Sequence, residues 1–118
     1  MKTKNMNASE PAFSQVPAKQ IKDGVTRSLV YTGNLMMAIL DFSNGPWNEP
    51  DPFHSHPHEQ ISYVAEGEII FYCEGYSERH LKQGDVFAVP SGKKHTIKLL
   101  TPSARLVDTF TPIREDFL

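Results

Sequence analysis

The chain contains a single cysteine, Cys73, among its 118 residues, so it cannot form an internal disulfide. We expect that thiol to be buried and unreactive, because it ends the apolar run 69–73. The net charge of −2 offers no basic surface of the kind that nucleic acids require. No apolar run is long enough to cross a membrane, and the first ten residues lack the apolar stretch of a secretory signal. We therefore expect a cytoplasmic protein without nucleic-acid or membrane partners.

Helical signals are also scarce, apart from a turn expected at 113–117. Short apolar runs alternate instead with turn-forming glycine, proline and asparagine residues, which is typical of a sandwich or barrel of short strands. The length predicts one domain with one core. Residues 1–20 are polar, and we expect a loose arm there, with a short strand near 13–16, followed by a barrel over 21–118. The expected strands are 25–31, 35–42, 61–65, 68–73, 78–81, 86–89, 95–100 and 105–110.

Four residues of this pattern suit a metal ion. His54 and His56 are two positions apart, so both side chains share a face if the segment is an extended strand. Gln60 opens the next strand after a turn, and His95 follows the turn at 90–92 on a distant strand. Neutral imidazole is the commonest metal ligand among side chains. The spacing predicts a metal site in the interior of the barrel.

The remaining two histidines have simpler interpretations. His58 lies in the turn that follows Pro57, and we expect a solvated turn residue or a group at the entrance of the site. His80 stands beside Arg79 and Lys82, which indicates a surface position. Neither is expected to bind the metal.

Two motifs extend this pattern. The run 54–67 resembles the first motif of the cupins, and the run 84–95 resembles their second motif. The second motif is matched at every spacing by Gly84, Pro90, Gly92 and His95. The resemblance implies an all-β, single-domain cupin, that is, a double-stranded β-helix or jelly-roll barrel.

Three positions depart from the cupin pattern. Gly45 lies farther from His54 than the first motif allows, so we expect a longer loop to enter the site. Leu99 replaces an asparagine that is not usually a ligand. Gln60 replaces the usual glutamate, so three imidazoles and an amide would leave a divalent ion its full charge. Such an ion attracts anions and polarises oxygen strongly, which favours an anionic substrate such as a sugar carboxylate.

The C-terminal segment adds three candidates for chemistry. Asp108 and Phe110 are two apart on an expected strand and share a face, although parity does not decide which face. Arg114 follows Pro112 in a turn that can bring its guanidinium to the barrel mouth, where it could bind a carboxylate. The alternatives are a solvated strand end for the aspartate, core packing for the phenylalanine and a surface charge for the arginine.

The run 54–60 and this segment together resemble one cupin group, the small pectin-degradation cupins that linearise 4,5-unsaturated uronates. This resemblance implies an enzyme that converts unsaturated monouronates from pectin or alginate to an open-chain 4-deoxy-5-keto uronate. The metal ligands that it implies are His54, His56, Gln60 and His95. The catalytic and substrate-binding residues that it implies are Asp108, Phe110 and Arg114.

Two other functions compete with this one. A three-histidine iron dioxygenase would use a similar neutral ligand set, and a non-catalytic cupin would bind a sugar or a metal only. The ligand types suit Ni, Mn, Zn or Fe and do not identify the metal. We also expect a homodimer, because a short barrel has exposed sheet edges that pairing would cover, and the N-terminal arm could exchange its strand with a partner.

Overall fold

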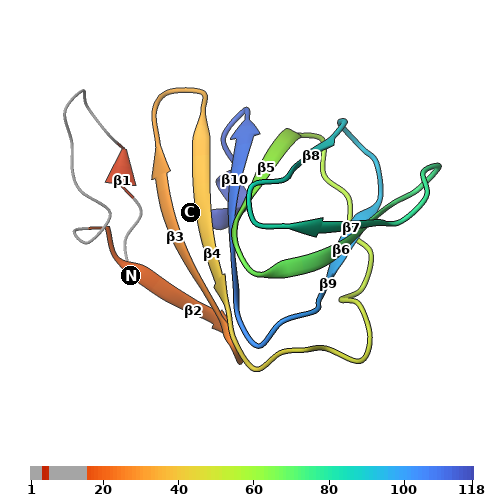
Figure 1. Ribbon diagram of the computed structural model, residues 1–118. Coiled ribbons are helices and arrows are strands. Elements are labelled where there is room, and N and C mark those ends of the chain that lie inside the picture. The colour runs from red at the N-terminus through yellow and green to blue at the C-terminus, as the bar shows by residue number, and fades with distance from the viewer. Residues whose placement is uncertain (1–3, 6–15) are drawn as a thin grey trace.

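The computed structural model describes residues 4–5 and 16–118 (Figure 1). Within them the chain forms strands and one short 3-10 helix, η2 (Glu115–Phe117). None of the described residues belongs to a helix long and apolar enough to cross a bilayer. The strands are β1 (Lys4–Asn5), β2 (Ala18–Lys22), β3 (Val25–Tyr31), β4 (Met36–Phe42), β5 (Glu59–Glu66), β6 (Glu68–Cys73), β7 (Arg79–Lys82), β8 (Val86–Val89), β9 (His95–Leu99) and β10 (Ala104–Thr111).

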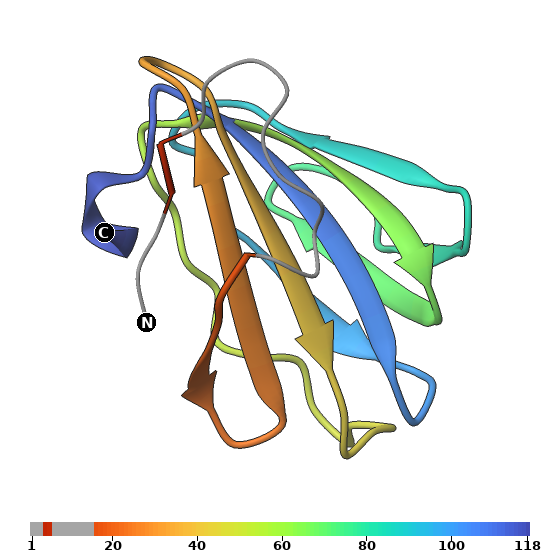
Figure 2. The ribbon, with the colours of Figure 1, turned by 90° about the vertical axis from the view of Figure 1, so that its left-hand side faces the viewer.

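The strands form two sheets. The larger sheet has the order β1-β3-β4-β10-β5-β8, with β2 also paired to β3, and the smaller sheet has the order β7-β6-β9. Figure 2 shows the long strands of the larger sheet running side by side, with the smaller sheet across from them. Except for the parallel pair of β1 and β3, neighbouring strands are antiparallel. The predicted all-β architecture, a sandwich or barrel of short strands, is confirmed.

The core lies between the two sheets. In β10 the burial alternates strictly, so every second side chain faces this core, as the pleat of a strand requires. The core includes Cys73, which is buried as predicted. Burial raises the pKa of its thiol. The core joins side chains from both sheets, among them Val64, Ile69, Phe71, Phe87, Leu99 and Leu106.

The eight expected strands are all present, with ends within two residues of the expected ones. Strand β2, whose five residues are exposed, was not expected as a strand. The strand expected near Phe13 lies outside the described residues, and exchange of the arm with a partner stays a prediction.

The expectation that His54 and His56 lie on an extended strand was wrong. Residues 43–58 form an irregular loop, and only His54 makes an isolated bridge, to His95. Prolines at positions 46, 50, 52 and 57 have no N–H to give, so a regular ladder cannot form. The loop nevertheless follows β9 in an antiparallel direction. Its backbone bonds are Trp47 N–H to the Leu99 carbonyl (2.9 Å), Asp51 N–H to Ile97 (3.2 Å) and His54 N–H to His95 (3.1 Å).

Candidate metal centre and pocket

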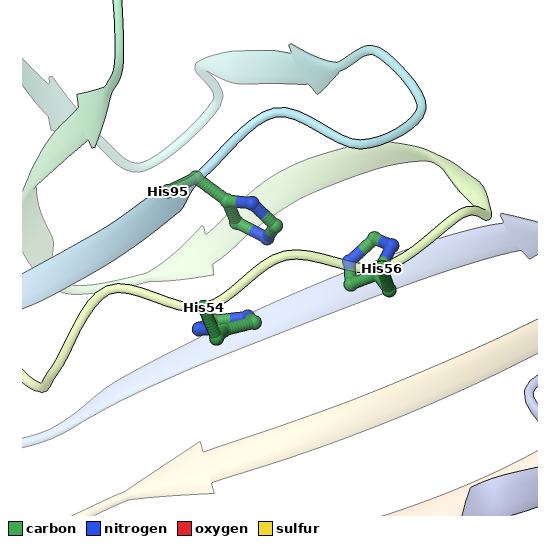
Figure 3. A group of neighbouring side chains, drawn as sticks. All are labelled: His54, His56 and His95. Atoms are coloured by element: carbon green, nitrogen blue, oxygen red, sulfur yellow. The ribbon is translucent and has the colours of Figure 1, made fainter.

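Three histidines converge where this loop meets the start of β9. One ring nitrogen from each of His54, His56 and His95 lies within 4.8 Å of the others. Figure 3 shows the first two rings on the loop and the third on β9. The structure thus brings together the predicted histidines, although the first two are not on a strand. His56 and His95 are buried whereas His54 is exposed, so one side of the group faces solvent rather than the closed interior that we expected.

Backbone carbonyls orient two of the rings. Nδ1 of His56 lies 3.0 Å from the carbonyl oxygen of His58, and Nδ1 of His95 lies 2.9 Å from that of Lys93. In both rings Nδ1 must therefore carry the hydrogen and donate it, which leaves a lone pair on Nε2. The buried Nε2 of His95 has no partner among the described residues. This arrangement is typical of histidines that bind a metal, whose second nitrogen is held by an outer partner.

Gln60 completes the group. Its amide nitrogen donates to the Ser62 hydroxyl over 2.8 Å, which turns its carbonyl oxygen toward His56. That oxygen lies 3.0 Å from Nε2 of His56, so two lone pairs face each other across a short gap. A proton on Nε2 would relieve this contact, but burial and the nearby Arg114 lower the pKa of His56. A divalent cation beside both atoms would relieve it as well, and the donor set therefore fits a metal.

The environment keeps the three imidazoles neutral. Burial lowers the pKa of all three rings, and the pKa of His95 falls to about 4. The positive charge of Arg114 acts in the same direction on each ring. A metal ligand must be deprotonated, so these shifts favour metal binding at neutral pH.

A chain of polar side chains leads from the glutamine to the predicted catalytic acid. The Ser62 hydroxyl donates to Oδ1 of Asp108 over 2.5 Å. Strands β5 and β10 pair so that Asp108 lies opposite Ser62 and Phe110 lies opposite Gln60. The shared face of Asp108 and Phe110 is thus the interior one, which parity alone did not decide.

Burial changes the acidity of Asp108. Burial raises its pKa to about 6, against the opposing effects of the Ser62 hydrogen bond and the charge of Arg114. A carboxyl with this pKa is present in both protonation states near neutral pH, which suits a general acid or base.

Phe110 and Arg114 lie close together on the wall of one pocket. The Phe110 ring packs edge-on against His56, with the centroids 5.7 Å apart. The Arg114 guanidinium lies 5.2 Å from the centroid of Phe110. It also forms a bidentate pair with Asp116, at 3.0 and 2.7 Å, and its side chain is only 11% exposed. Arg114 is therefore a largely buried residue and not a freely solvated charge.

These groups line one pocket with a volume of about 350 Å³. Its wall contains His54, Gln60 and His95 together with many apolar side chains. The other predicted residues on its wall are Asp108, Phe110 and Arg114.

The two remaining histidines lie outside the metal group. His80 is exposed and pairs with Glu68 at 2.8 Å, as expected of a surface residue. His58 is only partly exposed, and its Nδ1 is buried without a partner among the described residues, so it is not the solvated turn residue that we expected.

Two polar residues of the pocket region escaped the sequence analysis. Ser62 stands two positions after Gln60, so strand parity places both on one face, and that signal was available. Arg27 also lines the pocket, from β3. The sequence indicated this position of Arg27, because strand parity puts it on the same face as the apolar residues Val25 and Leu29.

The cupin domain family matches residues 46–110, more than half of the chain. This protein is a cupin. It is 35% identical over 106 residues to the pectin degradation protein KdgF of Dickeya dadantii (strain 3937), covering 88% of this chain and 93% of that one.

Solved structures agree with the sequence comparison. An RmlC-like cupin from Shewanella frigidimarina NCIMB 400 superposes with a TM-score of 0.83 at 32% identity, covering 95% of this cupin and 97% of that chain. KdgF from Halomonas sp. superposes with a TM-score of 0.79 at 30% identity, covering 90% and 96%. The predicted resemblance to the small pectin-degradation cupins is confirmed.

Proposed function

We propose that this cupin is a metal-dependent enzyme that linearises 4,5-unsaturated monouronates from pectin or alginate breakdown to the open-chain 4-deoxy-5-keto uronate. One observation supports this most: a buried Asp108 shares a pocket with His54 and His95, two members of the three-histidine group. The chain that carries this pocket is similar over most of its length to a pectin degradation protein.

The proposed metal ligands are His54, His56, Gln60 and His95. A divalent ion, one of Ni, Mn, Zn or Fe, would supply Lewis acidity and positive charge when bound there. The four neutral ligands leave that charge undiminished, and this suits a small sugar acid as the substrate.

Asp108 is proposed to move the proton that the reaction requires. The substrate is a cyclic hemiacetal whose ring oxygen is also an enol ether. Breaking the bond between C1 and the ring oxygen gives an aldehyde at C1 and an enol at C5, and protonation of C4 converts the enol to a ketone. The anomeric hydroxyl therefore loses one proton and C4 gains one. Ser62 engages Oδ1 of Asp108, so Oδ2 is the atom assigned to this transfer.

Phe110 and Arg114 are proposed to position the sugar. The aromatic ring forms an apolar wall beside the histidines, and the guanidinium at the mouth binds the carboxylate or another oxygen substituent of the substrate. Both act on the orientation of the substrate, whereas Asp108 acts on its protons.

The test is a time course on 4,5-unsaturated galacturonate generated by a lyase. Loss of the ultraviolet absorbance of the conjugated double bond is followed with metal-loaded and with chelated protein. We expect metal-dependent acceleration over the spontaneous rate.

Asp108→Ala should keep its metal content and lose turnover, and turnover that survives in this variant would refute the role of Asp108. Oxygen consumption that depends on iron would favour a dioxygenase instead, and turnover of any uronate would exclude a pure binding role.

We also propose that this cupin acts as a cytoplasmic homodimer. The outer face of the larger sheet exposes several large apolar side chains, which pairing with a second copy would cover. Tyr63 pairs with Val86, Ile61 lies two positions from Tyr63, and Met37 faces Ile61 across Thr109 of β10. Ile61→Lys should reduce the molar mass measured by light scattering to that of a monomer. The matched variant Lys98→Ile, on the smaller sheet, should leave the mass unchanged.

A further inference from the structure

Arg27 is a charged residue on the inward face of β3. Its neighbours on that face, Val25 and Leu29, are buried to 3% and 5% exposure. Arg27 itself is partly buried and lines the same pocket as Asp108 and the histidine group. Placing a guanidinium on an apolar face costs free energy unless something compensates its charge.

The described residues do not offer Arg27 a direct anionic partner. Among them it makes no hydrogen bond and no ion pair. The other arginine of the pocket is different, because Arg114 holds the Asp116 carboxylate in a two-pronged pair. Arg114 therefore spends two of its five N–H donors on that carboxylate, whereas no described residue accepts from Arg27.

An aromatic ring fixes the guanidinium of Arg27. Its Cζ lies 3.9 Å from the centroid of Phe117 in η2, and the Cζ of Arg114 lies 4.1 Å from the same centroid. Phe117 is thus held between two cations, a contact that stabilises both charges. A ring stacked on the flat face of a guanidinium leaves the N–H groups along its edge available. Carboxylates bind along that edge through two parallel hydrogen bonds.

We propose that Arg27 is a substrate-positioning residue that binds the carboxylate of the sugar acid through the edge of its guanidinium, which leaves Arg114 to bind another oxygen substituent. The identity of that sugar acid rests on the function proposed above, whereas the anion site rests on the pocket alone. Arg27 adds one positive charge to the pocket wall, without an ion-pair partner among the described residues, and one carboxylate would match it. Phe117 supplies the rigidity that keeps the donors in place before the substrate arrives.

The first experiment measures binding without turnover. Isothermal titration of the metal-loaded full chain uses saturated galacturonate, which has no enol ether to open, and neutral galactose. We expect wild type to prefer galacturonate. Arg27→Met should weaken galacturonate binding about 10- to 100-fold, the equivalent of losing charge-assisted hydrogen bonds, and should leave galactose binding unchanged. Arg79→Met, on the exposed strand β7, is the matched control and should behave as wild type.

A second readout separates positioning from a structural role. On the unsaturated uronate, Arg27→Met should raise KM by a similar factor while kcat stays within about threefold, as expected when an anchoring contact common to ground and transition states is removed. Arg27→Lys keeps the charge but lacks the paired N–H donors of a guanidinium, so it should give an intermediate loss of galacturonate affinity. It also tests the proposal if the methionine variant does not fold.

Three results would overturn the proposal. They are equal galacturonate affinity in both Arg27 variants and wild type, an equal loss for galactose, and a wild type that binds galacturonate no better than galactose. If Arg27 controls galacturonate binding but wild type does not open the unsaturated uronate, the anion site stands and the proposed reaction falls. If the reaction proceeds with an unchanged KM in Arg27→Met, the reaction stands and this assignment falls.

Discussion

At the scale of single residues, Asp108 shows how a buried carboxyl at a proposed catalytic position can cost stability. Its pKa is about 6, above its ordinary value of 3.8, because burial disfavours the charged carboxylate. The folded state therefore holds the proton more tightly than the unfolded state does. The resulting stabilisation is complete below pH 4 and is lost as the pH rises through 6. The loss amounts to roughly 3 kcal/mol, since one pKa unit is about 1.4 kcal/mol.

The first prediction follows from this sign. Asp108→Asn removes the charge and keeps an oxygen that accepts from Ser62. In chelated protein the variant should unfold at a higher temperature than wild type near pH 8, and the advantage should vanish near pH 4. Thermal unfolding by circular dichroism at both pH values measures the difference. An advantage that is equal at the two pH values would show that Asp108 is not a buried charge at pH 8.

Gln60 is the second residue for which charge matters, because its amide is neutral where a glutamate would be negative. Gln60→Glu should keep the metal, because a carboxylate is at least as good a ligand, but should lower kcat/KM about tenfold or more. A glutamate would reduce the charge of the site and could not donate to Ser62 as the amide does. Metal analysis and the absorbance assay test both parts. Gln83→Glu, at an exposed turn, makes the same charge change outside the pocket and should have no effect.

At the scale of elements, the strands were predictable because glycine and proline mark their ends. The segment 43–58 was not, because its course depends on backbone bonds to β9, a partner that lies far along the chain. The predicted convergence of the three histidines survived this error, since the family spacing reflects side-chain convergence and not strand geometry. Arg27 was missed for a related reason. An arginine in a short strand is expected to be exposed unless its neighbours on the same face are known to be buried.

Gly67 gives the prediction at this scale. It joins β5 to β6 with φ of +82°, and a Cβ there would lie 2.5 Å from the carbonyl oxygen of Ser103. Gly67→Ala should therefore lower the free energy of unfolding by about 2–4 kcal/mol, from backbone strain and overpacking together. Gly33→Ala is the control, because its Cβ meets nothing within 4 Å. Urea unfolding measures both, and equal midpoints would contradict the tight contact at Gly67.

At the scale of the whole molecule, the proposed metal site joins the two sheets. Gln60 belongs to the larger sheet, His95 to the smaller one, and the other two histidines to the loop that follows β9. An ion held by all four would exist only when both sheets and the loop are in place. Metal binding should therefore stabilise the entire fold and not one element of it.

The final prediction is the size and pH range of that stabilisation. An ion at about a thousand times its Kd adds roughly 4 kcal/mol, which corresponds to a rise in Tm on the order of 10–20 °C. His95→Ala should abolish the rise, whereas His80→Ala, on the surface, should retain it.

The pKa values of the three rings lie below the ordinary value of 6.5, so protons compete with the metal only in more acidic solution. Calorimetry should show the rise intact at pH 6 and lost as the pH falls toward 4, the pKa of His95. A rise that disappears already between pH 7 and 6 would mean that the ligands titrate as ordinary solvated histidines, and the buried three-histidine site would then be wrong.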